Sequence, residues 1–422
     1  MSVNNQIRVH VLVDLIWSPT AGGHVKCWEK LAHAAIQLGD VLDLTVHFSG
    51  DTQGVHTIAD NVRYAVHRPV FSTRNVPFLS HVPDHTDLAP YHGGLARALD
   101  GCDVIHTTDA YFAFAHTAVR VARRKAIPLV NSMHTDTPNY TRVFTAQTVE
   151  RLFGRGVLSK FLLDGIKVHE RAERKMLKKL ARHQAESAMA LVSRDDERRR
   201  ALDVLPEDRV RTLRRGIDRD LFNPVKKDRG WLKETYGVPE DRCLLFHAGR
   251  LDRGKNVLVL AHASRRLIDQ GHDVHLLCAG EGGDKEAVQD LLGTHVTCAG
   301  FVEGESLARL YASSDIFAFP STFEVYANVV MEALASGLPV VLSAEGGMDR
   351  VIKIGETGLS VSGDDRAWAD ALAALVTDKD RRVEMGHAAR RQAETSLPSW
   401  RDVLEQDLMP CWRRAHEEGA RQ

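Results

Sequence analysis

Short apolar runs alternate with segments of helical spacing along almost the whole chain. In the first half the apolar runs include residues 7–15, 42–48 and 128–135, and stretches with apolar residues every three or four positions lie between them. Runs of this length predict buried strands, and the intervening spacing predicts amphipathic helices. Strands that alternate with helices are typical of a parallel sheet covered by helices.

The same alternation restarts in the second half. Apolar runs at 243–251, 273–282, 315–321 and 338–344 follow one another, and a helix is predicted over 257–270. We therefore predict an α/β protein with two doubly wound, Rossmann-like domains. Ligands of such open sheets bind at the carboxyl ends of the strands.

The pattern divides the chain into four parts. Turn formers and charge, rather than a buried strand, mark the boundary between the two sheets. The last part has Trp400, Leu404, Leu408 and Trp412 at helical spacing, so we expect it to pack as a helix. The predicted parts are an N-terminal domain (1–215), a linker (216–239), a second domain (240–396) and a C-terminal helix (397–422).

The composition excludes several classes of protein. Lys+Arg (55) and Asp+Glu (56) nearly cancel over 422 residues, so we expect no nucleic acid partner. The six cysteines form no C-x-x-C pair, which speaks against a zinc or disulfide framework and favours a reducing compartment. No signal peptide and no run of about 18 apolar residues is found, so we expect a cytoplasmic protein.

One segment departs from neutrality. Residues 151–215 hold 18 Lys+Arg against 10 Asp+Glu. Within it, residues 157–182 place Phe161, Leu177 and Leu180 among cations, which predicts a basic amphipathic helix. Two interpretations stay open: a solvated outer face, or docking on an anionic membrane such as the inner face of the cell membrane.

The strongest candidate for chemistry is the segment 320–341, PSTFEVYANVVMEALASGLPVV. Glu324 and Glu332 are separated by seven residues, and a helix is predicted to start near Ala327. A carboxylate can accept from two neighbouring hydroxyls, so Glu332 suits a ribose and Glu324 suits sugar hydroxyls. The backbone amides at the start of the helix favour a phosphate group. They belong to Tyr326, Ala327, Asn328 and Val329.

A second candidate is the segment 248–256, AGRLDRGKN. Arg250 follows a predicted strand, and Lys255 follows Gly254 at the predicted start of a helix. Two cations beside such a turn suit a diphosphate leaving group, whose negative charge grows as a glycosidic bond breaks. A lone R-x4-K would be surface noise, and so would two glutamates at this spacing, which are common on helices.

Taken together, these residues resemble the E-x7-E motif of the family-4 retaining glycosyltransferases, which have the GT-B fold. The match extends through Pro320-Ser321, Asn328 to Val330 and Ala335 to Val341, and weaker matches span about residues 190–363. Ala327 stands where the family often has Gly. GT-B proteins return a C-terminal helix to the first domain, which the resemblance therefore implies for residues 397–422.

The resemblance also implies roles for single residues. In that family, cations at the positions of Arg250 and Lys255 hold the donor diphosphate, and a Gly-rich loop at Gly23 lies near it. A histidine at the position of His134 lies beside the transferred sugar, and we predict His134 and Glu324 as the catalytic residues. The backbone bordering the nucleobase is implied at Gly280, Gly300, Phe301 and Val302.

The activity implied is transfer of a hexose-type sugar from a UDP- or GDP-sugar to an acceptor hydroxyl, with retention at the anomeric carbon. Residues 1–215 would bind the acceptor and 240–396 the nucleotide-sugar. The basic segment and the phrase HTDTPNY (134–140) look like glycolipid-forming members. They favour a lipid acceptor (diacylglycerol or polyprenyl-linked) over a soluble metabolite, and a saccharide acceptor stays open.

Other chemistries lack their central parts. His81-x3-His85 has helical spacing but contains Pro83, and the D-x-D at 218–220 does not follow a strand. We therefore predict no essential metal and no cofactor besides the donor. A phosphorylase or epimerase of the same fold, or an inactive nucleotide-binding scaffold, stays open as an alternative.

Overall fold

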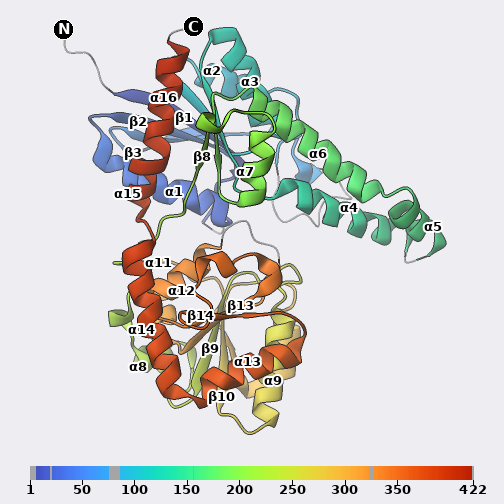
Figure 1. Cartoon of the computed structure of the whole chain (residues 1–422), viewed down its shortest axis with the longest axis vertical. Coiled ribbons are helices and arrows are strands. Elements are labelled where there is room, and N and C mark those ends of the chain that lie inside the picture. The colour runs from blue at the N-terminus through green and yellow to red at the C-terminus, as the bar shows by residue number, and fades with distance from the viewer. Residues whose placement is uncertain (1–5, 20, 76–85, 155, 323–326, 421–422) are drawn as a thin grey trace. The chain divides into compact units, whose positions relative to one another are not determined.

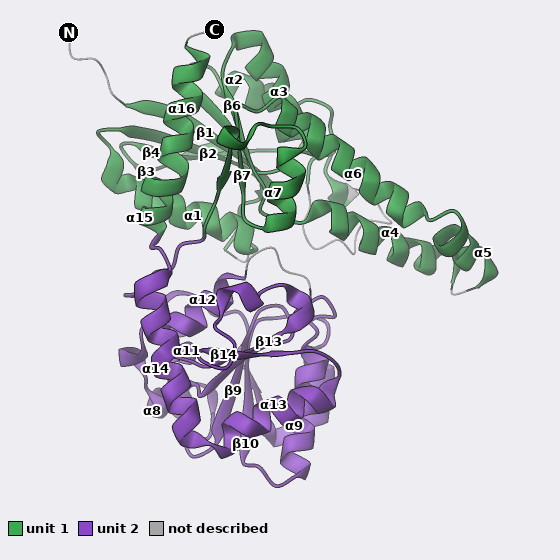
Figure 2. Ribbon diagram, in the orientation of Figure 1, with its two compact units in different colours: residues 1–214, 400–422 green, residues 215–399 purple. Residues whose placement is uncertain are grey.

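The apolar runs predicted as strands form two separate sheets (Figure 1). The structure is a computed structural model, and the residues it describes are 6–19, 21–75, 86–154, 156–322 and 327–420. They divide into two compact units (Figure 2). The first unit is residues 1–214 with 400–422, and the second unit is residues 215–399.

The first unit is built on a sheet of eight strands in the order β3-β4-β2-β1-β5-β6-β7-β8. All neighbours run parallel except β3 and β4, which are antiparallel. The strands are β1 (Ile7–Ile16), β2 (Leu42–Ser49), β3 (Gly54–Ala59), β4 (Val62–His67), β5 (Val104–Thr107), β6 (Leu129–Ser132), β7 (Met189–Val192) and β8 (Val210–Thr212).

Helices complete the first unit. The first three helices and the last ones pack their apolar faces on the sheet, which is thereby buried on both sides. The helices are α1 (Gly23–Ala35), α2 (Gly93–Ala98), α3 (Ala113–Lys125), α4 (Thr137–Phe153), α5 (Val157–Lys160), α6 (Val168–Ala185), α7 (Asp195–Leu202), α15 (Trp400–Val403) and α16 (Met409–Gly419).

The end of the chain belongs to this first unit. Leu404, Leu408 and Trp412 are buried in the same core cluster as β1 and β2, and Trp400 packs against that cluster. The backbone N–H of Arg214 donates to Asp407 Oδ2 (2.9 Å), and the Arg214 side chain donates to the same carboxylate. The stripe at helical spacing is therefore a packing face.

The second unit has a fully parallel sheet in the order β11-β10-β9-β12-β13-β14. Its strands are β9 (Cys243–Ala248), β10 (Val274–Ala279), β11 (Val296–Cys298), β12 (Ile316–Phe319), β13 (Val340–Ser343) and β14 (Gly358–Val361). Its helices are α8 (Arg229–Tyr236), α9 (Val257–Asp269), α10 (Lys285–Leu292), α11 (Gly304–Ser313), α12 (Asn328–Ala335), α13 (Asp365–Thr377) and α14 (Lys379–Ser396). The predicted class, two doubly wound α/β domains, is confirmed.

The segment 216–239, predicted as a linker, lies inside the second unit. Leu232 on α8 and Val238 are buried in the core of that unit. Asp218, of the D-x-D triplet, accepts from the backbone N–H groups of Asp220 (3.2 Å) and Leu221 (2.9 Å). The triplet therefore forms part of a turn.

The basic segment forms the outer part of a helical hairpin (Figure 1). Helices α4 and α6 pack side by side, and α5 continues into a π-helical turn at Phe161–Gly165. The prediction of one continuous helix over 157–182 is wrong. Lys167 adopts a left-handed conformation (φ 55°) that ends the first helix and starts α6.

Candidate functional site

Three loops meet at the carboxyl ends of β9, β10 and β11 in the second unit. The N–H of Gly249 donates to the carbonyl of Ala279 (2.9 Å), and that of Gly280 donates to the carbonyl of Gly300 (2.7 Å). The N–H of Leu251 donates to the carbonyl of Glu281 (3.0 Å). The loops predicted to border the donor are thus hydrogen-bonded to one another through their backbones.

Glycine is required at the centre of this contact. A Cβ on Gly280 would lie 1.9 Å from the carbonyl oxygen of Gly249, and φ at Gly280 is +147°. A Cβ on Gly282 would lie 2.2 Å from the carbonyl oxygen of Leu251. The close backbone approach therefore depends on the missing side chains.

The two predicted cations lie on one turn after β9. Asp252 organises this turn, because its carboxylate pairs with Arg250 Nε (3.0 Å) and accepts from the backbone N–H of Lys255 (3.1 Å). Lys255 Nζ lies over the ring of Phe319 at the end of β12, 5.7 Å from the ring centroid. Arg250 is exposed and Lys255 is half-buried, so both cations reach the surface at this edge of the sheet.

Glu332 lies on α12 and is oriented by a buried tyrosine. The hydroxyl of Tyr311, on α11, donates to Glu332 Oε2 (3.0 Å). Burial and the neighbouring carboxylate raise the pKa of Tyr311 well above its usual value, so the hydroxyl keeps its proton and remains a donor. The carboxylate, itself only half-buried, is held in one direction.

The remaining predicted donor residues differ in how far the structure describes them. Glu324 and Tyr326 lie outside the described residues. Ala327 is buried and precedes α12, whose first residues are Asn328 and Val329.

Two more predicted residues follow Gly300. Phe301 is 49% exposed, unlike the phenylalanines in the core of this unit, and Val302 is half-buried against that core. An exposed aromatic side chain beside the Gly280–Gly300 contact is available to pack on a ligand.

In the first unit, the structure brings the loop after β1 against the loop after β6. Gly23 begins α1, and a Cβ built on it meets nothing within 4 Å, so this glycine is not enforced by crowding. The ring of His24 stacks on that of His134, with centroids 4.5 Å apart and an interplanar angle of 6°. His134 is buried, and its Nε2 lies 2.9 Å from the hydroxyl of Ser132.

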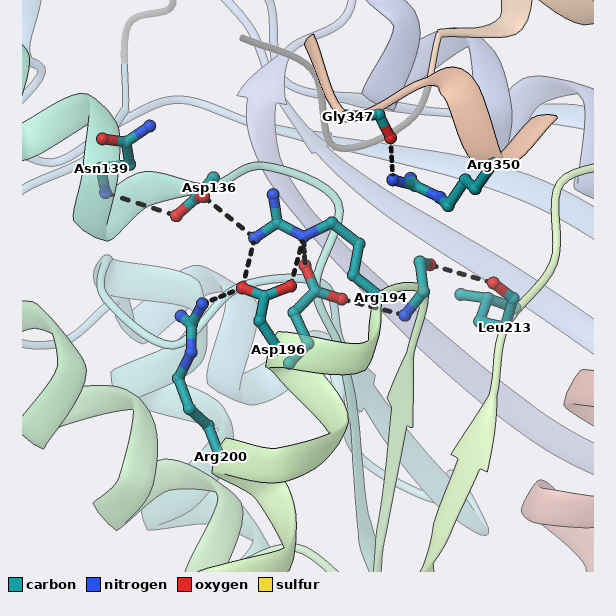
Figure 3. Close-up of polar contacts among 10 residues, drawn as sticks. Asp136, Asn139, Arg194, Asp196, Arg200, Leu213, Gly347 and Arg350 are labelled. Atoms are coloured by element: carbon teal, nitrogen blue, oxygen red, sulfur yellow. Dashed lines mark hydrogen bonds and ion pairs between the residues drawn. The ribbon is translucent and has the colours of Figure 1, made fainter. Parts of the chain in front are cut away.

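An arginine that the sequence reasoning missed anchors the same loop (Figure 3). Arg194 Nη2 donates to Asp136 Oδ2 (2.9 Å), and its Nε pairs with Asp196 (3.1 Å) and Glu197 (3.2 Å). Asp136 in turn caps α4 by accepting from the N–H of Asn139 (3.3 Å). The N-cap of α4, two residues after His134, is therefore tied to the start of α7.

Sequence signals for these missed residues were weak. Tyr311 and Arg194 are far in sequence from the groups they orient, so no spacing reveals them. Asp252 could have been found, since an aspartate three residues before an amide that it caps is a known turn signal.

Two kinds of feature are absent from the described part of the chain. No helix among those residues is long and apolar enough to cross a membrane. No group of three or more His, Cys, Asp or Glu side chains there is arranged to hold a metal ion.

The chain is similar to known glycosyltransferases in sequence. The family described as "Glycosyl transferases group 1" matches residues 242–378, which contain the loops and cations described above. A D-inositol 3-phosphate glycosyltransferase of Xylanimonas cellulosilytica is 31% identical over 301 residues, covering 68% of this chain and 67% of that protein. The sulfoquinovosyl transferase SQD2 of Arabidopsis thaliana is 27% identical over 305 residues, covering 71% of this chain but only 54% of SQD2.

A solved structure agrees on the fold. The sucrose-phosphate synthase of Thermosynechococcus elongatus superimposes with a TM-score of 0.72 at 19% identity, covering 98% of this chain and all of that one. Two Rossmann-like units of this kind define the GT-B architecture. The chain belongs to the group 1 glycosyltransferases, and the predicted family is confirmed.

Proposed function

We propose that this glycosyltransferase moves a hexose-type sugar from a UDP- or GDP-sugar to an acceptor hydroxyl, with retention at the anomeric carbon. One observation carries the donor assignment: the contact of the three loops after β9, β10 and β11, with two cations on its rim. This is the strand edge at which open α/β sheets bind nucleotides. The carboxylate of Glu332, held by Tyr311, supplies the acceptor pair that a ribose needs.

The proposed roles follow from charge. Arg250 and Lys255 neutralise the diphosphate as the glycosidic bond breaks, and the backbone amides at Gly23 and at the start of α12 add dipoles of the same sign. Glu332 binds the ribose, and Glu324 and His134 orient the transferred sugar. Catalysis then rests on positioning and on stabilising the leaving group, without a metal and without a protein nucleophile.

The donor site is tested with a thermal-shift panel of UDP, GDP, ADP, CMP and their sugars, because a ligand that binds only the folded state raises the apparent Tm. A rise selective for UDP or GDP is expected, and no shift with any of them at millimolar concentration would refute the donor site. Lys255→Ala should lower turnover about a hundredfold, whereas Arg253→Ala, on the same turn, should not. Lys255→Ala and Glu332→Gln both staying within a few-fold of the parent would refute the assigned roles.

Stereochemistry and reaction class need a product assay. Retention predicts that the anomeric configuration of the donor is preserved in the product, which proton NMR of the isolated glycoside reads directly. Consumption of inorganic phosphate would instead identify a phosphorylase. Nucleoside diphosphate released without any glycosylated product would refute sugar transfer, and a nucleotide-sugar recovered with one inverted hydroxyl would identify an epimerase.

We further propose a lipid acceptor, reached at an anionic membrane surface. The support is the outer end of the α4–α6 hairpin, where large apolar side chains are exposed. Val157 is 86% exposed and Phe161 59% exposed, and they have similar neighbours. These hairpin-tip residues are Leu152, Phe153, Val157, Leu158 and Phe161.

Exposed cations accompany the apolar tip. They lie on the tip and along α6, where they suit anionic headgroups while the apolar side chains enter the interface. These cations are Arg151, Lys160, Lys167, Arg171, Arg174, Lys175 and Lys178. The names of the two relatives above give an inositol 3-phosphate, which is water-soluble, and a sulfoquinovosyl group, which is the group transferred. The lipid acceptor is therefore supported by the hairpin alone.

Liposome flotation tests the membrane proposal. The parent should co-float with vesicles containing phosphatidylglycerol at low salt and dissociate at high salt, because exposed charges are screened. The double variant Val157→Ser/Phe161→Ser should lose most of this binding. Val225→Ser, at a valine in the second unit that is 82% exposed, is the matched control and should float like the parent. A parent that does not float with anionic vesicles would refute this part.

A further inference from the structure

A chain of hydrogen bonds joins the C-terminal helix to His134 inside the first unit. The indole N–H of Trp412, on α16, donates to His106 Nδ1 on β5 (2.9 Å). His106 Nε2 lies 2.8 Å from the hydroxyl of Ser132 at the end of β6, and that hydroxyl lies 2.9 Å from His134 Nε2. Trp412 is 306 residues away from His106 in sequence.

The indole N–H of Trp412 fixes which atom donates and which accepts in each of these hydrogen bonds. An indole nitrogen can only donate, so Nδ1 of His106 must be an acceptor. A neutral imidazole carries one proton, so in His106 it lies on Nε2 and is donated to Ser132 Oγ. The hydroxyl proton of Ser132 is then left for His134 Nε2, which must accept it. A neutral His134 accordingly carries its own proton on Nδ1.

Burial supports each step. Trp412, His106 and Ser132 are 0% exposed, and His134 is 6% exposed, so water does not replace these partners. Burial lowers the pKa of His106 to about 3, which keeps that ring neutral near pH 7. The two histidine rings are the partners that the hydroxyl of Ser132 has in the described chain, so its proton has no other acceptor there.

We infer that Trp412 is a positioning residue that fixes His134 as the Nδ1–H tautomer. Only the role of this tautomer rests on the proposed function: His134 would offer the sugar a hydrogen-bond donor at Nδ1 rather than an acceptor. The last helix of the chain thereby acts on the sugar-binding side chain without touching the sugar. The helix would then serve catalysis through the indole N–H of Trp412, in addition to stabilising the first unit through its apolar side chains.

The tautomer is measured directly on the protein without substrate. Long-range ¹H–¹⁵N correlation spectra of ¹⁵N-histidine-labelled protein distinguish protonated from bare ring nitrogens, and His134→Asn assigns the signals. We expect a bare Nε2 and a protonated Nδ1 at His134. Trp412→Phe removes the indole N–H and keeps an aromatic ring, so a mixture of both tautomers should appear. A protonated Nε2 in the parent, or an unchanged tautomer in Trp412→Phe, would overturn the inference.

Trp28→Phe is the matched control. Trp28 is also buried, its ring lies 5.2 Å from that of His106, and its indole N–H has no hydrogen-bond partner among the described residues. The substitution removes the same atoms beside the same histidine but leaves the chain of hydrogen bonds intact. The His134 tautomer should therefore stay that of the parent. A mixture in Trp28→Phe equal to that in Trp412→Phe would overturn the inference, since packing alone would explain both.

Kinetics supply the second readout. Trp412→Phe and Ser132→Ala should each lower kcat by about threefold to tenfold, the value of one hydrogen bond, with the KM for the donor within about twofold. Because both interrupt one chain, the double variant should be little slower than either single variant. Strictly additive losses would overturn the inference. If Trp412→Phe does not fold, the His134 tautomer is measured in Ser132→Ala instead. A mixture of both tautomers is expected there, and an unchanged tautomer would overturn the inference.

Failure of the proposed function and failure of the tautomer inference give different results. If the protein transfers no sugar from any nucleotide-sugar, the proposed function fails, and the spectra still decide whether Trp412 sets the tautomer. If His134→Asn transfers sugar at the parent rate, the role of His134 fails, again without affecting the spectra.

Discussion

Replacing Gly280 by alanine tests whether the loop contact in the second unit depends on backbone approach. The new Cβ would lie 1.9 Å from the carbonyl oxygen of Gly249 and 2.8 Å from its carbonyl carbon. Neither backbone can withdraw easily, because Gly249 and Gly280 are hydrogen-bonded to Ala279 and Gly300. The φ of +147° adds strain for any residue with a side chain.

The two effects set the magnitude. A non-glycine residue in such a backbone conformation lowers the free energy of unfolding by about 1–3 kcal/mol. Overpacking against a rigid neighbour lowers it by about 1–3 kcal/mol more. We expect Gly280→Ala to lower the free energy of unfolding of the second unit by about 4 kcal/mol. For a unit of this size that corresponds to a Tm lower by roughly 8–16 °C. Binding of the nucleotide, which the proposed function assigns to the same loops, should be lost as well.

Differential scanning calorimetry of the parent and the variant measures the shift, and the nucleotide thermal-shift panel measures the binding. Gly283→Ala is the control in the same loop, since a Cβ there meets nothing within 4 Å. It should change the Tm by no more than about 2 °C, as surface substitutions do. If the two variants unfold within about 2 °C of each other, the reasoning from backbone contact is refuted.

Three further predictions concern the first unit. Arg194→Ala should lower the free energy of unfolding by about 2–4 kcal/mol because it leaves three carboxylates without their shared cation. Arg194→Lys should restore less than half of this loss, since lysine lacks the planar guanidinium group. Urea unfolding of both variants measures the two effects, and full restoration by lysine would contradict the prediction. Stability should fall as the pH drops from about 6.5 to about 4, because burial lowers the pKa of His67 to about 4 and lowers that of His47, so the unfolded chain binds protons that the folded chain does not. Urea midpoints at pH 7.5 and 5.0 test this, and His67→Asn should reduce the dependence without abolishing it, because burial also lowers the pKa of His10 and His183. Asp407→Ala should lower stability by about 2–3 kcal/mol because Arg214 loses a buried acceptor for its backbone and side chain; an unchanged urea midpoint would contradict it.

Local pattern was sufficient to predict the class of fold. The helix predicted over 257–270 is α9 at Val257–Asp269, and the apolar runs at 243–251 and 273–282 contain β9 and β10. Such elements depend on side chains a few residues apart, which a sequence displays directly. Prediction failed where the local signal was ambiguous: residues 157–182 have helical spacing throughout, yet Lys167 breaks the helix.

For the candidate site, the residue types on the loops came from the sequence and its resemblance to a family. Their assignments to donor, ribose and sugar stay predictions. The structure adds the partners that orient them: Tyr311 for Glu332, Asp252 for the turn with Lys255, and Arg194 for the loop after His134. None of these partners is marked by the family motifs.

By itself, the sequence determined the alternation of strands and helices, the two-domain class and the family, because these depend on short-range periodicity and on contiguous motifs. Only the tertiary structure decided which distant side chains meet. It placed Trp412 against His106 and His106 beside Ser132, because parallel strands and the final helix bring together residues that are separated along the chain. The physical reason is that a hydrogen bond is set by position and direction in space, and no spacing in the sequence encodes either across hundreds of residues.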